Sequence, residues 1–186
     1  MDEIALYLEE AKESMEKTLQ HTKIELSKIR AGKANPAILD GIKVEYYGSM
    51  TPISQVASIT TPDVRTIVIK PWEKNMIPII EKAIKESELR LNPQNDGEVI
   101  RIILPPLTED RRRDLVKQAK GECEQGKVAV RNIRKETNEG LRKLIKEGVA
   151  EDVVKAAEEK VQKLTDTYVA KIDELLAVKE KDIMTI

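Results

Sequence analysis

The chain has 186 residues, of which 40% are hydrophobic and 35% are charged, and its formal net charge at pH 7 is -1. A single cysteine excludes an internal disulfide and a cysteine-ligated zinc site, and it favours a reducing cytoplasm. Acids and lysines are spread through the first thirty residues, and no apolar run approaches the ~20 residues of a membrane span. We therefore expect neither a signal peptide nor a membrane partner.

The first predicted element is an amphipathic helix over residues 1–30, which contain no proline or glycine. Its apolar or small residues recur at steps of mostly three and four, which is typical of a helix that packs along one stripe. This stripe consists of Ile4, Leu8, Ala11, Met15, Thr18, Thr22, Leu26 and Ile29. Gly32 and Asn35-Pro36 end the helix, because the residue before a proline disfavours helical torsions.

Residues 31–105 have the pattern of a small α+β domain. Ile42, Val44 and Tyr46 alternate with polar neighbours ahead of a turn at Gly48-Ser49, which predicts a strand. Further strands are expected over residues 56–60, 66–69 and 99–104. A helix is expected over residues 75–88, with an apolar side formed by Ile79, Ile80, Ala83 and Ile84.

The helical period returns after Pro105-Pro106 and predicts two more long helices. Thr108 is the expected N-cap of the first, which runs to about Gly148. Its stripe consists of Ala119, Cys123, Gly126, Val130, Ile133, Thr137 and Leu144. The stripe of the last helix consists of Val154, Ala157, Val161, Leu164, Tyr168, Ile172, Leu175 and Ile183.

Three long helices with one apolar stripe each must bury those stripes against one another. We therefore predict an α+β chain in which residues 1–30 and 106–186 form a long antiparallel three-helix bundle. Residues 31–105 form a small β/α/β sandwich-like domain inserted between helices 1 and 2. Two crossings between domains, with no third tether, predict hinges near residues 30–33 and 104–107. The expected hinge residues are Arg30, Ala31, Gly32, Lys33, Leu104, Pro105 and Pro106.

The small net charge hides a segregation of charge along the chain. Residues 107–148 hold twelve bases and eight acids, whereas residues 1–30 and 149–186 each hold more acids than bases. Six of the ten arginines lie on the second long helix, and the third has none. Because a guanidinium group binds phosphate oxygens bidentately, this distribution favours a nucleic-acid partner.

Projected at ~100° per residue, most bases of the second long helix fall near one line, about 120° from its apolar stripe. This basic face consists of Arg113, Lys117, Lys120, Lys127, Arg131, Arg134 and Arg142, and it should point to solvent. Arg111 and Arg112 lie off the line at the helix start. The alternative is a solvated face neutralised by local pairs such as Glu109 with Arg113 and Lys120 with Glu124.

No constellation of residues predicts catalysis, a metal site or a cofactor. Residues 121–128 nearly match a phosphate-binding loop, but Val128 replaces the required hydroxyl residue and the segment lies within a helical pattern. Its glycines are better explained by close helix packing. We expect His21 at the surface, Cys123 in the apolar stripe and Trp72 as a packing anchor of the inserted domain.

Several motifs resemble one family, the bacterial ribosome recycling factors. Residues 28–34 (KIRAGKA) and 104–109 (LPPLTE) resemble its two hinge regions, and residues 40–48 (DGIKVEYYG) resemble its first strand and turn. Residues 128–134 (VAVRNIR) resemble the basic face of its long helix. Lys33 and Lys135 stand where members often carry arginine, which keeps the charge.

The resemblance implies an L-shaped, monomeric, cytoplasmic protein that is not an enzyme. It implies binding to the large subunit of the post-termination 70S ribosome, followed by subunit splitting with elongation factor G and GTP. Initiation factor 3 then helps keep the subunits apart. The arginines that contact large-subunit RNA in the family match Arg112, Arg131 and Arg134, and we expect Arg113, Lys120 and Lys127 to assist them.

Two other classes of function are compatible with parts of the sequence. A helical adaptor would bind a protein through its charged faces, and it would have no affinity for ribosomes. An enzyme using the inserted domain would need a nucleophile and base or a metal cluster, and the sequence signals neither.

Overall fold

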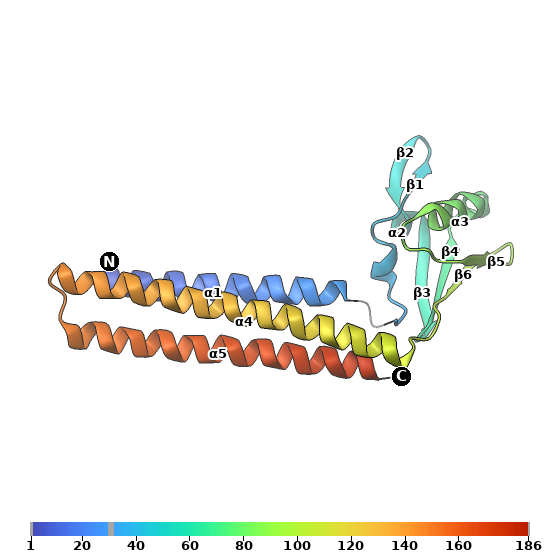
Figure 1. The fold of residues 1–186 in the computed structure, drawn as a ribbon. Coiled ribbons are helices and arrows are strands. Elements are labelled where there is room, and N and C mark those ends of the chain that lie inside the picture. The colour runs from blue at the N-terminus through green and yellow to red at the C-terminus, as the bar shows by residue number, and fades with distance from the viewer. Residues whose placement is uncertain (1, 30–31, 186) are drawn as a thin grey trace. The chain divides into compact units, whose positions relative to one another are not determined.

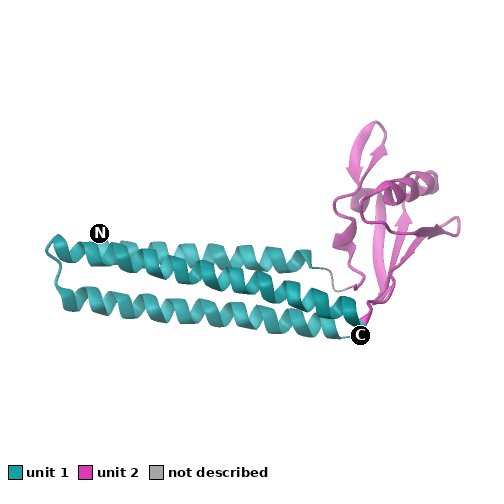
Figure 2. Ribbon diagram, viewed as in Figure 1, with its two compact units in different colours: residues 1–31, 109–186 teal, residues 32–108 magenta. Residues whose placement is uncertain are grey.

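The computed structural model describes residues 2–29 and 32–185. The chain separates into two compact units, one of residues 1–31 and 109–186 and the other of residues 32–108 (Figure 2). The first unit contains the long helices, and the second contains all the described strands (Figure 1). The chain is therefore α+β, as predicted, with a sheet-containing insertion between the first and second long helices.

Three long helices form the first unit: α1 (Glu3–Lys28), α4 (Glu109–Lys146) and α5 (Glu151–Met184). They lie side by side along their length (Figure 1). Gly126 of α4 approaches Thr22 of α1, whereas Gly140 approaches Tyr7, so these two helices are antiparallel. Ion pairs between Arg142 and Glu158 and between Lys120 and Glu180 give the same antiparallel relation for α4 and α5.

The buried stripes of the bundle largely follow the predicted ones, with several exceptions. In α1, Leu19 is buried in place of the expected Thr18: Leu19 is 4% exposed, whereas Thr18 is only half-buried. Leu115 and Leu141 of α4 and Thr165 of α5 are also buried and were missed. Ile133, Leu164 and Leu175 are half-buried rather than central. Steps that alternate strictly between three and four residues drift against the true helical period of about 3.6 residues per turn. The buried position therefore shifts to a neighbouring residue, as it does from Thr18 to Leu19.

The helix termini follow from local chemistry. The side chain of Asp2 accepts a hydrogen bond from the backbone N–H of Ile4 at 3.2 Å and caps α1. Gly148 ends α4 in the left-handed region, at φ 102°. The backbone N–H of Val149 then donates to the carbonyl oxygen of Leu144 at 3.0 Å, so a free carbonyl of the last turn is satisfied.

The second unit contains a four-stranded antiparallel sheet in the order β3-β4-β6-β5. The strands are β3 (Ala57–Asp63), β4 (Thr66–Pro71), β5 (Pro93–Asn95) and β6 (Ile100–Ile103). A separate hairpin of β1 (Lys43–Tyr46) and β2 (Ser49–Pro52) stands beside α3 (Ile77–Glu86) (Figure 1). The remaining elements are α2 (Ile53–Val56) and the short 3-10 helices η1 (Pro36–Leu39) and η2 (Lys74–Met76).

One apolar cluster fills this unit, and it includes Ile67, Ile69, Ile80, Ile84 and Ile100. Two sequence-based assignments were wrong. Ile79 is 42% exposed, because the buried side of α3 is defined by Ile77, Ile80 and Ile84 at steps of three and four. Trp72 is 69% exposed and is therefore not a packing anchor, since it follows the last buried strand residue, Pro71.

The two segments that connect the units are anchored to the second unit on their described sides. The backbone N–H of Ala34 donates to the carbonyl oxygen of Val64 at 2.6 Å. The backbone N–H of Leu104 donates to the carbonyl oxygen of Arg65 at 2.7 Å. Leu104 is a buried member of the apolar cluster. A Cβ added to Gly32, which has φ 71°, would lie 2.6 Å from Cγ of Leu107. The expected hinge residues Arg30 and Ala31 lie outside the described residues.

None of the helices in the described ranges has an apolar stretch long enough to cross a bilayer.

Candidate nucleic-acid interface

The basic face of α4 presents most of its side chains to solvent. The exposed fraction of the side chain is 68% for Arg113, 61% for Lys120, 47% for Arg131 and 64% for Arg142. The helix continues without a break from Glu109 to Lys146, so these positions share one side of a rigid rod. The predicted exposure of the face therefore holds for these four residues.

Several side chains of the face reach across to α5. Nζ of Lys120 lies 3.6 Å from Oε1 of Glu180, and Nε of Arg142 lies 2.6 Å from Oε1 of Glu158. Nη1 of Arg134 donates to the neutral Gln162 at 3.2 Å. These partners were not predicted, although acids recur on α5 at intervals of seven or eight, at Glu158, Asp166, Asp173 and Glu180. That spacing was the available signal.

Other pairs lie within α4 itself. Nη2 of Arg113 contacts Oε1 of Glu109 at 2.5 Å, which is one of the local pairs expected for a solvated face. Nη1 of Arg131 lies 3.5 Å from Oε1 of Glu124. The other expected local pair, Lys120 with Glu124, is replaced by the contact of Lys120 with Glu180 on α5. The face is thus partly neutralised, both locally and by α5.

Lys127 departs from the expectation that the whole face points to solvent. Its side chain is only 17% exposed, because its ammonium group contacts Asp173 at 2.5 Å and Glu124 at 3.8 Å. The hydrogen bond to Asp173 raises the pKa of Lys127 above its ordinary value. Lys127 therefore ties α4 to α5 and offers little free surface to a ligand.

Arg112 lies on the side of α4 that is buried further along the helix. It precedes Leu115 by three residues and Ala119 by seven, and both of these are buried. Arg112 itself is half-buried, and its Nε is buried without a hydrogen-bond partner among the described residues. A buried donor without an acceptor costs free energy, so an acceptor supplied by a ligand would be favourable here.

The arrangement can hold an anionic polymer through contacts to its phosphates. An exposed ion pair contributes only about 0–1 kcal/mol, so phosphate oxygens can replace the carboxylate partners at small cost. Arginine then gains bidentate, charge-assisted hydrogen bonds to phosphate. The sequence of α4 contains no aromatic residue, so this face offers no aromatic platform for base stacking.

The segment that resembles a phosphate-binding loop and Cys123 lack the geometry that their chemistry would require. The segment resembling a phosphate-binding loop is continuous helix within α4, and Cys123 is fully buried. Burial raises the pKa of the Cys123 thiol, which disfavours the reactive thiolate. His21 is exposed, as expected. The described residues contain no cluster of histidine, cysteine or carboxylate side chains suited to a metal ion.

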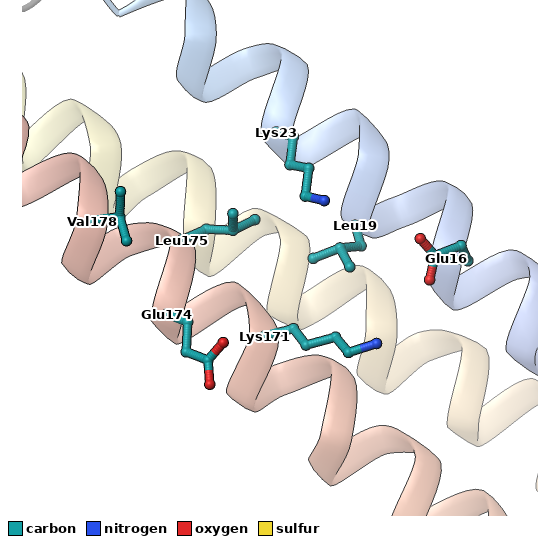
Figure 3. A pocket seen from close by; sticks show the side chains of 7 residues that line it. All are labelled: Glu16, Leu19, Lys23, Lys171, Glu174, Leu175 and Val178. Carbon is teal, nitrogen blue, oxygen red and sulfur yellow. The ribbon is translucent and has the colours of Figure 1, made fainter.

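A separate depression of about 340 Å³ lies between α1 and α5 (Figure 3). Its charged lining comprises Glu16, Lys23, Lys171 and Glu174, so carboxylates balance ammonium groups and the depression does not extend the basic face. Glu16 of α1 also accepts a hydrogen bond from the hydroxyl of Tyr168 on α5, which joins the two helices. Within α5, Nζ of Lys171 lies 4.7 Å from the centre of the Tyr168 ring.

Comparison with known proteins identifies relatives over the whole chain. The family model described as ribosome recycling factor matches residues 22–184. A ribosome-recycling factor of Cytophaga hutchinsonii is 59% identical over 186 residues, which cover all of both chains. One from Flavobacterium psychrophilum is 55% identical and covers 100% of this chain and 99% of its own.

Two solved structures have the same fold. A solution structure of a ribosome recycling factor is 45% identical, covers both chains completely and has a TM-score of 0.79. The second is a Thermus thermophilus ribosome recycling factor, described together with Escherichia coli elongation factor G bound to the post-termination complex. It is 45% identical, covers 98% of this chain and 99% of its own, and has a TM-score of 0.63.

Proposed function

Because the chain belongs to the ribosome recycling factor family, a family of non-enzymatic translation factors, we propose that it splits the ribosome after termination. It binds the large subunit of the post-termination ribosome and, with elongation factor G and GTP, separates the subunits and releases the mRNA. A solved relative that is described with elongation factor G on a post-termination complex supports this assignment.

The observation that carries the proposal is the exposed, arginine-rich side of α4. Arg131 and Arg134 contact phosphates of ribosomal RNA, and Arg113 and Lys120 extend the contact along the rod. Arg112 binds at the helix start, where its buried Nε lacks a partner among the described residues. Lys127 contributes by holding α4 against α5 rather than by direct contact.

Binding of this kind exchanges weak ion pairs for phosphate contacts. Glu124 and Gln162, the present partners of Arg131 and Arg134, are released when the guanidinium groups turn to RNA. Each phosphate contact also releases about one counterion. The affinity for large subunits therefore falls steeply as the salt concentration rises.

The second unit transmits force from the GTPase to the contact between the subunits. Residues 1–30 and 106–186 act as the RNA anchor, residues 31–105 act as the moving domain, and residues 30–33 and 104–107 act as its hinges. The anchoring of Ala34 and Leu104 to the second unit supports a short pivot, because both residues lie at the ends of the proposed hinges. The factor works as a cytoplasmic monomer, and initiation factor 3 keeps the separated subunits apart.

The experiment that tests the RNA face is a splitting assay with post-termination ribosomes, elongation factor G and GTP. The double variant Arg131→Glu, Arg134→Glu should split far fewer ribosomes at the same concentration. It should also make large-subunit binding less dependent on salt, by the change in slope expected for the loss of roughly two phosphate contacts. The matched control is Lys160→Glu, Lys163→Glu, which reverses two exposed charges on α5.

Sedimentation with large subunits at two salt concentrations separates the proposal from a helical adaptor. The proposal requires binding that weakens strongly at the higher concentration. Absence of binding at either concentration would favour the adaptor. Equal activity of the double variant and the wild type would refute the assigned face even if ribosomes bind.

A further inference from the structure

A cluster of two tyrosines and one carboxylate lies on the second unit, apart from the residues used above. The hydroxyl of Tyr46 donates to Oε1 of Glu73 at 3.1 Å, and that of Tyr47 lies 3.3 Å from Oε1 and 3.2 Å from Oε2. The two rings meet edge to face, with their centroids 4.5 Å apart. We call Tyr46, Tyr47 and Glu73 the tyrosine–carboxylate cluster.

The cluster exposes aromatic side chains in a chain that has few of them. The sequence contains one tryptophan, four tyrosines and no phenylalanine. Tyr47 is nevertheless 80% exposed, and Trp72, which directly precedes Glu73, is 69% exposed. The backbone N–H of Trp72 donates to Val56 at 3.0 Å, which fixes the chain beside the cluster. Exposed tyrosine and tryptophan are enriched where proteins bind other proteins.

The cluster is also held in an unfavourable backbone conformation. Tyr47 has φ 47° and the next residue, Gly48, has φ 81°, so both lie in the left-handed region at the tip of the β1–β2 hairpin. The left-handed region is sterically unfavourable for a residue with a side chain. Asparagine or glycine would fit this turn better. A strained tyrosine whose hydroxyl is clamped by Glu73 indicates a preorganised binding surface.

The chemistry of the cluster selects a cationic ligand. Glu73 brings a negative charge to two aromatic rings, and the hydrogen bonds to its carboxylate raise the pKa of both Tyr46 and Tyr47. A carboxylate repels the phosphates of RNA but attracts a guanidinium group, which can also stack on an aromatic ring. The two hydroxyl protons, of which that of Tyr47 is shared between Oε1 and Oε2, leave lone-pair positions of the carboxylate free to accept a further donor.

We propose that the tyrosine–carboxylate cluster is a docking site for an arginine-bearing segment of a protein partner. A guanidinium group lies against the ring of Tyr47 and donates to Glu73. The site is distinct from the RNA face in its charge, its residues and the class of partner. It does not depend on the proposed role of the α4 arginines.

Binding can be measured on the full chain with a short peptide of alternating arginine and glycine, by calorimetry at physiological salt. Trp72 is the only tryptophan, so its fluorescence reports whether the peptide binds beside the cluster. We expect saturable binding with a blue shift of the Trp72 emission, because an exposed indole becomes covered. The corresponding lysine peptide should bind several-fold more weakly, since it lacks the planar guanidinium group.

The decisive variant is Glu73→Gln, which keeps an acceptor for the tyrosine hydroxyls but removes the charge. It should weaken peptide binding about tenfold, as expected for the loss of a charge-assisted hydrogen bond. The matched control is Glu98→Gln, which removes one charge from an acid that is 74% exposed on the same unit. This control should bind as the wild type does.

A second variant tests the proposal independently in case Glu73→Gln does not fold. Tyr47→Asn removes the ring but suits the left-handed turn, so the hairpin should remain folded while binding weakens. Wild-type affinity in both Glu73→Gln and Tyr47→Asn would overturn the proposal. So would equal weakening by Glu98→Gln, peptide binding without a change in Trp72 emission, or an RNA hairpin that alters this emission when the peptide does not.

Discussion

Gly121 and Gly126 belong to the same helix but have different surroundings. A Cβ added to Gly126 would lie 2.5 Å from Oγ1 of Thr22 and 3.3 Å from Cδ1 of Ile172, whereas one added to Gly121 meets nothing within 4 Å. The sequence-based explanation that both glycines allow close helix packing therefore holds for Gly126 and fails for Gly121. Sequence cannot distinguish them, because both interrupt the same helical pattern.

This difference predicts opposite effects of the same substitution. Gly121→Ala should stabilise the bundle by about 0.5–1 kcal/mol, because alanine favours the helix. Gly126→Ala should destabilise it by about 1–2 kcal/mol, because overpacking outweighs that gain. Thr22 cannot turn away freely, since its hydroxyl donates to the carbonyl oxygen of Thr18 at 3.0 Å. Urea unfolding followed by far-UV ellipticity measures both changes, and effects of the same sign would contradict the described contact.

At the candidate site, individual residues also separate what sequence predicts from what packing decides. The alignment of Arg113, Lys120 and Arg131 follows from helix geometry and was predicted. The burial of Lys127 was not, because it depends on Asp173 of another helix. A charge pattern on one helix gives the direction of its side chains, but the neutralising partners depend on how the next helix lies against it.

Among the described elements, the long helices and the strands β1, β3, β4 and β6 were predicted within a few residues, whereas β2 and β5 were missed. Residues 1–30 were expected for α1, which spans Glu3–Lys28, because many turns repeat the same period. Strand β5 (Pro93–Asn95) was missed, since three residues carry no period and Pro93 argues against a strand. Its place at the sheet edge, paired only with β6, is where a proline is tolerated.

One tyrosine in the contact between α1 and α5 gives a pH-dependent contribution to stability. Tyr168 is 3% exposed, and its hydroxyl donates to Oε2 of Glu16 at 2.8 Å. Burial and the Glu16 carboxylate raise the pKa of Tyr168 to about 12. In the unfolded chain this phenol loses its proton near pH 10. Its stabilising effect is therefore complete below about pH 10 and is lost as the pH rises towards 12.

Tyr168→Phe should remove this dependence. At pH 7 the free energy of unfolding should fall by about 1 kcal/mol, because a hydrogen bond is lost. Between about pH 10 and 12, it should decline less steeply in the variant than in the wild type. Urea unfolding at several pH values measures the two slopes. Titration of the lysines changes the free energy of unfolding of both proteins alike, so its effect cancels in the comparison. Parallel curves would show that Tyr168 keeps an ordinary pKa.

At the scale of the whole molecule, each unit has its own apolar cluster. The second unit is built around residues such as Ile69, Ile84 and Ile100, and part of the bundle is built around Leu141, Leu144 and Val161. The insertion itself could be predicted, because the helical period stops and later returns. The place where each connecting segment becomes anchored could not, since it depends on hydrogen bonds to Val64 and Arg65 in a distant turn.

Separate clusters predict that the units lose structure separately. Ile100→Ala and Leu141→Ala each remove a fully buried side chain, one from the second unit and one from the bundle. Each should cost the affected unit about 2–5 kcal/mol, which accelerates its slowest amide exchange roughly thirty-fold or more. Hydrogen exchange followed by mass spectrometry should place the effect of Ile100→Ala in β4, β6 and α3. Leu141→Ala should act in α4 and α5, and acceleration of both units by either variant would mean that they unfold as one.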